Sequence, residues 1–269
     1  MFSKKSSRRA ARTLVGLLFV VGLVVAVTPA QAITYGQADT EHPFVGAMVV
    51  QSKFGWTSEW CSGTLIAPRV FLTAGHCTVD IDAYVTGPAD VHISFGPNVL
   101  TQSTWHDVQE WVTSPDYWWG PMSDPHDVGV VILKDPVTDL GYGVLAPEAG
   151  YLTTLWMQGR LTPATKFLNV GYGSDQNFAD TNVREYSWSA YRSLHFAWLY
   201  MSQNVHAGSA GTCFGDSGGP TFYVTSSRAE YVVAVTSWGD AQCKATNNNY
   251  RVDTAESLAF LSDMMAEFA

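Results

Sequence analysis

The chain has 269 residues, of which 46% are hydrophobic and 14% are charged. A chain of this length and composition can bury a sizeable core, which argues against an intrinsically disordered protein. Acidic residues outnumber basic ones by 24 to 15. This balance argues against nucleic acid or an anionic membrane as the main partner.

The first 32 residues have the pattern of a secretory signal peptide. Five basic residues precede an uncharged apolar run from Leu14 to Val27, and the small-residue segment Ala30-Gln31-Ala32 follows it. A transmembrane anchor is the alternative, but this run is short for a span that needs about twenty residues. We therefore expect residues 1–32 to direct secretion, by the general secretory route or by twin-arginine export, for which Ser7-Arg8-Arg9 is suitable.

Removal of this leader would change the charge of the protein. It would take away five of the 15 basic residues and no acidic residue, which leaves a formal charge of −14. We expect an extracellular protein with an acidic surface that does not bind a membrane once the leader is removed.

Short β-branched or aromatic runs separated by turn residues make up most of the remaining chain, which is typical of an all-β protein. Only the C-terminus predicts a helix, with Thr254 as its N-cap. The apolar residues expected on one face of this helix are Leu258, Leu261, Met265 and Phe268. The runs that predict strands are residues 46–50, 63–66, 70–73, 91–95, 128–133, 167–172, 220–224 and 231–237.

Four cysteines in a secreted chain predict disulfide bonds, although three pairings are open and the spacing does not choose among them. Metal binding is the alternative for cysteines that lie near histidines. The chain has no paired CxxC or HxxxH spacing, so we expect no bound metal.

The segment from Cys213 to Pro220, with the sequence CFGDSGGP, places a hydroxyl group among residues that let the backbone bend around it. A serine hydroxyl is a poor nucleophile at neutral pH, so acyl transfer needs a base and N–H donors for the developing oxyanion. Gly215 lacks a Cβ, so a substrate carbonyl could approach its N–H, and the N–H of Ser217 could be the second donor. A simple Gly/Ser turn beside a disulfide is the alternative, but eight residues in this arrangement favour Ser217 as a nucleophile.

A candidate base and a candidate carboxylate lie upstream of this serine. His76 lies in LTAGHC, residues 72–77, and Asp127 lies in HDVGVVIL, residues 126–133. With Ser217, these motifs resemble those of the trypsin/chymotrypsin-like serine proteases, in particular a secreted bacterial type: TAAHC, DIALL and GDSGGP in the same order. The resemblance covers the chain after about the first thirty residues and departs from the family at Gly75 and in the looser Asp127 segment. Neither departure removes a catalytic side chain.

The resemblance implies an all-β fold of two antiparallel six-stranded barrels with the active site in the cleft between them. The first barrel would span residues 33–143 and carry His76 and Asp127. The second would span residues 144–269, carry Ser217 and end in the C-terminal helix, and the two would form one peptidase domain. The family also implies the disulfides Cys61–Cys77 and Cys213–Cys243.

The implied activity is that of a serine endopeptidase that works through an acyl-enzyme and needs no metal or organic cofactor. Ser217 would attack the scissile carbonyl, His76 would transfer the proton, Asp127 would orient the imidazole, and the N–H groups of Gly215 and Ser217 would bind the oxyanion. We expect a protein or peptide as the partner and a monomeric enzyme. The rival interpretation is a secreted binding protein that keeps the protease scaffold without its chemistry.

The resemblance also places the substrate. The peptide backbone would pair with Ser237-Trp238-Gly239, and the Ser237 hydroxyl would lie near Asp127. The floor of the primary pocket would be at Gly211, and an Asp at this position would select Arg or Lys. Thr212 follows it. Residues 244–249 supply no carboxylate, so cleavage after basic residues is not expected.

The family resemblance also argues against cleavage after glutamate. Relatives that cleave after glutamate resemble one another in a His just before the Ser-Trp-Gly segment, where this chain has Thr236. We therefore expect cleavage after apolar or aromatic residues.

Activation in this family uses a new N-terminal Ile or Val whose ammonium group pairs with the Asp before the catalytic serine. Ile33 directly follows the expected cleavage site at Ala32, and Asp216 directly precedes Ser217. We expect Ile33 and Asp216 to form this pair without a separate zymogen stage. The alternative is that the leader ends elsewhere and another group satisfies Asp216.

Overall fold

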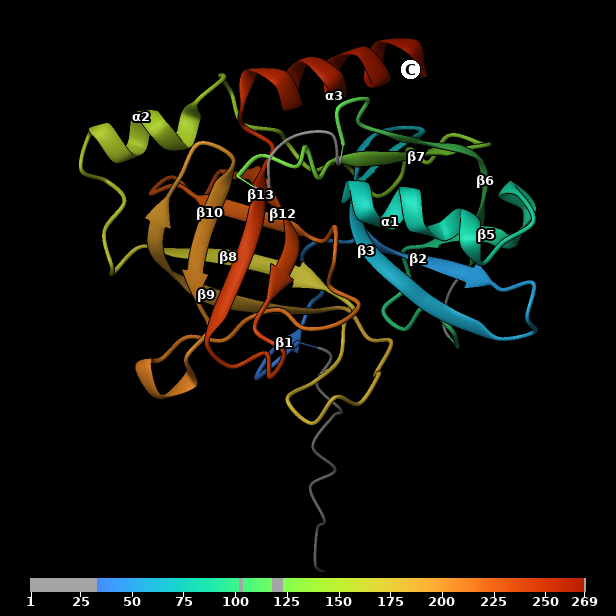
Figure 1. The fold of residues 1–269 in the computed structure, drawn as a ribbon, viewed down its shortest axis with the longest axis horizontal. Coiled ribbons are helices and arrows are strands. Elements are labelled where there is room, and N and C mark those ends of the chain that lie inside the picture. The colour runs from blue at the N-terminus through green and yellow to red at the C-terminus, as the bar shows by residue number, and fades with distance from the viewer. Residues whose placement is uncertain (1–32, 102–103, 118–122, 269) are drawn as a thin grey trace, which may run out of the picture.

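The computed structural model describes residues 33–101, 104–117 and 123–268. Two antiparallel β-barrels lie next to each other, and helix α3 (Ala255–Glu267) extends along one end of the molecule (Figure 1). This architecture confirms the predicted fold class. The leader, residues 1–32, lies outside the described residues, so the signal peptide stays a prediction. No helix in the described ranges has the length and apolar character needed to cross a membrane.

The first barrel is closed, with the strand order β2-β3-β4-β7-β6-β5. Its strands are rich in β-branched residues, which suit a pleated and half-buried surface. Leu65, Phe71 and Ile93 are among the fully buried side chains that fill its interior. The strands are β2 (Val45–Gln51), β3 (Thr57–Ala67), β4 (Val70–Thr73), β5 (Val91–Ser94), β6 (Trp105–Thr113) and β7 (Gly129–Leu133).

The second barrel has the strand order β9-β10-β13-β12-β11-β8, and the pairing of β8 with β9 closes it. The short strand β1 (Gln37–Ala38) pairs with the first residues of β9. Phe167, Leu199 and Val233 are buried inside this barrel. The strands are β8 (Lys166–Gly171), β9 (Glu185–Leu194), β10 (Trp198–Ser202), β11 (Pro220–Val224), β12 (Glu230–Gly239) and β13 (Thr246–Arg251).

A third hydrophobic cluster joins the two barrels and α3. It includes Val45 and Val130 from the first barrel, Tyr172 and Phe222 from the second, and Leu261 from α3. Burial of this shared apolar surface holds the two barrels in a fixed relative position.

Helix α3 confirms the helix predicted at the C-terminus. The Thr254 hydroxyl accepts a hydrogen bond from the N–H of Ser257 at 3.2 Å, which satisfies one of the free donors at the helix start. The sequence did not predict α1 (Gly75–Val79) and α2 (Tyr151–Met157), because helices this short show no periodic pattern. Three single-turn 3₁₀ helices complete the description: Asp80–Ala83, Pro88–Asp90 and Val205–Ala207.

Both disulfides join the pairs that the resemblance implies. Cys61–Cys77 ties β3 to α1, and Cys213–Cys243 ties the Ser217 loop to the loop between β12 and β13. Each bond constrains a loop in the unfolded chain and so stabilises the folded one.

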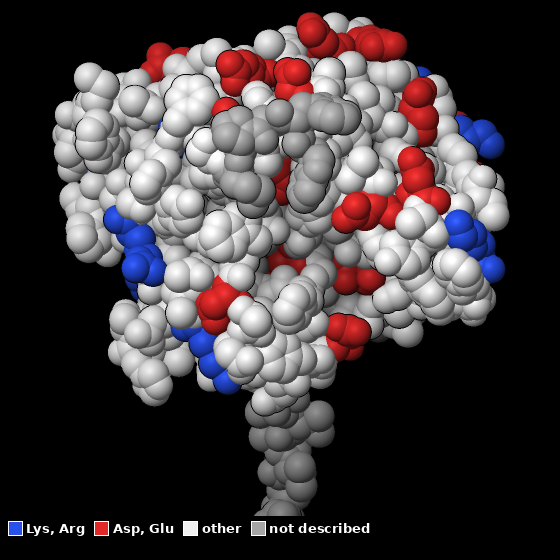
Figure 2. Space-filling view, viewed as in Figure 1, with Lys and Arg blue, Asp and Glu red and all other residues white. Residues whose placement is uncertain are grey.

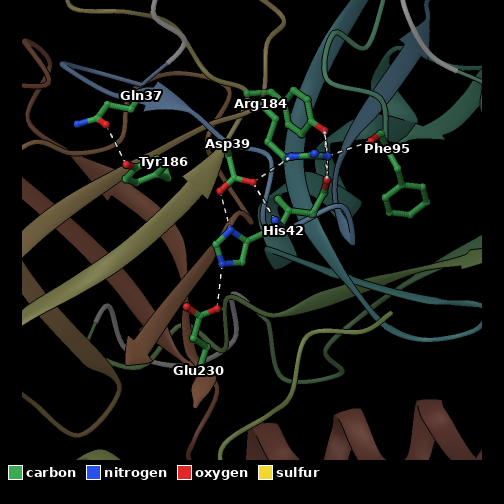
Figure 3. Close-up of polar contacts among 9 residues, drawn as sticks. Gln37, Asp39, His42, Phe95, Arg184, Tyr186 and Glu230 are labelled. Atoms are coloured by element: carbon green, nitrogen blue, oxygen red, sulfur yellow. Dashed lines mark hydrogen bonds and ion pairs between the residues drawn. The ribbon is translucent and has the colours of Figure 1, made fainter. Parts of the chain in front are cut away.

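A buried ion network ties the N-terminal segment to both barrels. His42 lies between two carboxylates, with Nδ1 2.6 Å from Asp39 and Nε2 2.9 Å from Glu230 (Figure 3). Arg184 lies 3.3 Å from Asp39 and donates to the carbonyl of Phe95 in the first barrel at 2.9 Å. Burial disfavours the charged imidazole, but the hydrogen bonds and charges of Asp39 and Glu230 outweigh it and raise the pKa of His42.

This network predicts a pH-dependent contribution to stability. Because the pKa of His42 is raised in the folded state, its stabilisation is complete below the unfolded value of about 6.5 and is lost as the pH rises through the folded pKa. Replacement of His42 by Gln should lower the free energy of unfolding by about 1 kcal/mol at pH 6, and the difference should shrink toward pH 9. Denaturant unfolding across this range tests it, with His206→Gln, an exposed histidine, as the control. A difference that grows with pH would contradict the assignment.

Candidate active site

His76 and Asp127 meet at the edge of the first barrel. His76 lies in the first turn of α1, which begins directly after β4 and is held by the neighbouring Cys61–Cys77 bond. Its ring Nδ1 is 3.0 Å from Oδ2 of Asp127, and its backbone N–H donates to Oδ1 at 2.8 Å. The Ser237 hydroxyl, from β12 of the second barrel, donates to the same Oδ2 at 2.5 Å. Three donors therefore hold the Asp127 carboxylate in one orientation.

These contacts change the ionisation of both groups. Burial disfavours the imidazolium, but the charge and hydrogen bond of Asp127 outweigh it and raise the pKa of His76. Burial also disfavours the carboxylate, but His76 and the hydrogen bond from Ser237 keep the pKa of Asp127 below its usual value. Asp127 can therefore stay ionised next to a histidine that gains a proton.

Ser217 lies in the turn before β11, on the wall of the second barrel. Its carbonyl accepts the N–H of Ser62 from β3 at 2.9 Å, which fixes the turn against the first barrel. Gly218 follows with φ +78°, and a Cβ there would lie 2.6 Å from the carbonyl oxygen of Ser62. Glycine is thus required next to Ser217 for both its backbone conformation and the available space.

Gly215 also occupies a place that only glycine can fill. Its φ is +93°, and a Cβ would lie 2.6 Å from Oε2 of Glu59 and 2.9 Å from Cα of Gly173. Glu59 has no motif around it to signal a role, so the sequence did not predict its place here. Its Oε1 is buried without a hydrogen-bond partner among the described residues. Burial raises the pKa of Glu59 well above its usual value, with Asp216 and Asp180 adding to the effect.

The structure does not bring Ile33 to Asp216, contrary to the pair expected from the sequence. The backbone N–H of Ile33 donates to Oε2 of Glu185 at 3.1 Å. Asp216 instead accepts the N–H groups of Gly173 at 2.9 Å and Cys213 at 2.8 Å. The physical reason is that Ile33 lies within the chain here, so its nitrogen is an uncharged amide. Burial raises the pKa of Asp216 to about 8.

Four of the five expected substrate-binding residues line a cavity of about 370 Å³ next to Ser217. Thr212, Ser237, Trp238 and Gly239 are all on its walls, whereas Gly211 is buried nearby. Trp238 is 50% exposed, so its face is open to a bound molecule.

Asp240 is the one carboxylate among the residues that line this cavity. It accepts the N–H groups of Ala245 at 2.8 Å and Thr246 at 2.7 Å. Although burial opposes the charge, these backbone bonds lower the pKa of Asp240. Its charge is therefore used to hold the loop between β12 and β13.

Apart from the disulfide region, one cluster of possible metal ligands occurs among the described residues. Asp124, His126 and Glu256 each place a ligand atom within 4.8 Å of the others. The Tyr250 hydroxyl already donates to Asp124 at 2.7 Å, and Glu256 is exposed. The cluster thus has the ordinary features of a polar surface at the start of α3.

Comparison with known proteins defines the class of this protein. Residues 34–259 match the family model described as Trypsin, so the chain belongs to the trypsin family of serine proteases. It is 28% identical over 219 residues to a trypsin of Saccharopolyspora erythraea, a match that covers 74% of this chain and 82% of that protein. It is 27% identical over 215 residues to a phenoloxidase-activating enzyme of Bombyx mori, covering 68% of this chain and 48% of the relative.

Proposed function

We propose that this protein is a secreted serine endopeptidase with His76, Asp127 and Ser217 as its catalytic triad. The observation that carries the proposal is the chain of hydrogen bonds from Ser237 through Asp127 to His76. Ser237 lines the same cavity as Ser217, and Sγ of Cys77, the residue after His76, is 3.7 Å from the carbonyl oxygen of Ser217. Acyl transfer requires a hydroxyl nucleophile, a base and a carboxylate that orients the base, and Ser217, His76 and Asp127 offer these groups.

The reaction would take place in two halves. The Ser217 hydroxyl attacks the scissile carbonyl while His76 takes its proton, and His76 then protonates the leaving amine as the acyl-enzyme forms. Water, activated by His76, releases the second product. Asp127 stabilises the imidazolium in both halves, and the N–H groups of Gly215 and Ser217 hold the oxyanion.

The substrate would be an extended peptide. Ser237-Trp238-Gly239 lies at the end of β12, where a peptide could add as an antiparallel partner. On the face shown in Figure 2, Asp and Glu gather over α3 and the first barrel, and Lys and Arg lie toward the edges. This distribution supports a peptide rather than a nucleic acid as the partner. We expect residues 33–143 and 144–269 to act together as one peptidase unit in a monomer.

A fluorophosphonate probe tests the proposal, because it reacts only with an activated serine. We expect the purified protein to be labelled at Ser217 and to hydrolyse peptide amides. A silent binding protein on the same scaffold, the rival function, would do neither.

The start of the mature chain gives a separate prediction. Ile33 is fully buried and its nitrogen lies 3.1 Å from Glu185, so cleavage after Ala32 would create an ammonium group beside a buried carboxylate. We expect the secreted enzyme to begin at Ile33. One extra residue ahead of it should lower kcat/KM by at least about tenfold, because an uncharged amide would then replace the ammonium group beside Glu185, whose charge acts on Asp216 next to Ser217.

N-terminal sequencing and the activity of the extended form check this prediction. The same residue added at the C-terminus is the matched control and should have no effect. An active enzyme that begins elsewhere, or one that is indifferent to the added residue, would rule the mechanism out.

A further inference from the structure

Four uncharged polar side chains are buried together beside the cavity next to Ser217. Gln203 follows β10, Asn247 and Asn249 belong to β13, and Thr236 belongs to β12. Only 2% of Gln203, 1% of Asn247 and 0% of Asn249 is exposed. In the strand register Asn249 lies opposite Thr236, and Asn247 lies opposite Gly239. Residues 247 and 249 share one face of their strand, because successive side chains alternate.

These side chains lack protein partners for their polar atoms. Among the described residues, no hydrogen bond satisfies Oε1 of Gln203, Oγ1 of Thr236, or either amide atom of Asn247 and Asn249. Buried polar groups are normally paired, so this group requires water or a bound molecule that can both donate and accept hydrogen bonds.

Gln203 lies where the floor of the cavity is expected. A Cβ on Gly211 would overlap the Gln203 side chain and lie 2.8 Å from its Cδ. The Gln203 Nε2 is 4.0 Å from the place of a Cβ on Gly239, a residue of the cavity wall. The carboxamide of Gln203 thus occupies the space into which a side chain at position 211 would project.

The residues that line the cavity carry a single charge, that of Asp240. Asp240, the one carboxylate on the cavity wall, hydrogen-bonds to backbone N–H groups of its own loop. A cationic substrate side chain would find only Asp240, whose carboxylate already accepts backbone N–H groups, and an anionic one would find no cation on the wall. An apolar side chain would leave the amides of Gln203, Asn247 and Asn249 unpaired.

We propose that Gln203, Thr236, Asn247 and Asn249 form a hydrogen-bonding floor that selects substrates with a neutral carboxamide, glutamine or asparagine, at the residue whose carbonyl is cleaved. A carboxamide is the side chain that offers a donor and an acceptor without charge. This inference rests on the proposed protease function. It replaces the expectation of apolar or aromatic specificity drawn from the sequence.

A peptide series that differs only at this residue tests the proposal. We expect kcat/KM for Gln to exceed that for the similarly shaped Glu and Met by at least about tenfold, and Asn to exceed Leu likewise. Gln203→Met should remove most of the preference for Gln over Met. Gln109→Met, an exposed glutamine on β6, is the matched control and should keep it.

A second variant tests the same floor by introducing a new preference instead of removing the old one. Gln203→Glu places a carboxylate there and should raise cleavage after Lys or Arg relative to Gln by at least about tenfold. Fluorophosphonate labelling identifies the variants whose active site is assembled. If the probe labels Ser217 but no peptide is cleaved, peptide aldehydes with the same side chains are ranked by how well they block labelling, and the same order is expected.

The outcomes separate the two proposals. A wild-type preference for Leu, Phe, Lys, Arg or Glu, an absence of preference, or a Gln203→Met variant that keeps the preference for Gln would overturn the carboxamide assignment and leave the protease function in place. A wild-type protein that is neither labelled nor active would overturn the protease function and, with it, this inference.

Discussion

Replacement of Ser217 by alanine is expected to lower peptide hydrolysis by about 10⁴-fold or more, because the variant lacks the hydroxyl that would form the acyl-enzyme. The rate of amide hydrolysis by the purified variant is the measurement. His76→Ala should have an effect of similar size, since a hydroxyl without a base stays protonated at neutral pH.

The combined variant is the sharper form of this test. If His76 and Ser217 act as one unit, removing both should cost no more than removing one. Ser226→Ala, an exposed serine in the turn between β11 and β12, is the matched control and should hydrolyse peptides normally. Wild-type rates in Ser217→Ala, or fully additive losses in the double variant, would contradict the proposed triad.

Replacement of Gly215 by alanine is expected to lower kcat by about 10²–10³-fold, the usual effect of losing an oxyanion donor. The reason lies in the space around the backbone. At φ +93° the new methyl group would meet Glu59 Oε2 at 2.6 Å and Gly173 Cα at 2.9 Å, so the loop must shift and carry its N–H away from the cleft. Steady-state kinetics with one peptide substrate measures the effect.

Gly55→Ala is the matched control for this variant. Gly55 has a nearly equal φ of +89°, but a Cβ there meets no atom within 4 Å and the residue is exposed. Both variants should lose about 1–2 kcal/mol of stability from backbone strain. Gly215→Ala should lose more than Gly55→Ala because its Cβ also meets Glu59 and Gly173, and only Gly215→Ala should lose activity. Equal kinetic losses in the two variants would mean that Gly215 has no special place in the reaction.

Short-range patterns account for the part of the fold and of the candidate site that the sequence could predict. The strand runs and the capped helix after Thr254 follow from short-range patterns, and the structure confirms both. The residues proposed for chemistry sit in compact motifs in which a tight turn demands glycine at positions such as 218. Such motifs can be recognised in the sequence because the residue types that each turn requires lie within a few positions of one another.

Short helices and contacts between distant residues could not be predicted from local sequence patterns. Helix α1 carries His76 but has only five residues, too few for a periodic signal. Ser237 and Asp127 are 110 positions apart, so their hydrogen bond could be expected only from the family resemblance.

By itself, the sequence determined the all-β class, the acidic character and the residues on which the proposed chemistry depends. Only the tertiary structure decided that Ile33 faces Glu185, 152 positions away, and that Gln203 lies against Gly211 below the cavity. The physical reason is that a buried polar group takes its partner from whatever the folded barrels place beside it. That neighbourhood depends on strand register and loop path, which no local pattern of residues encodes.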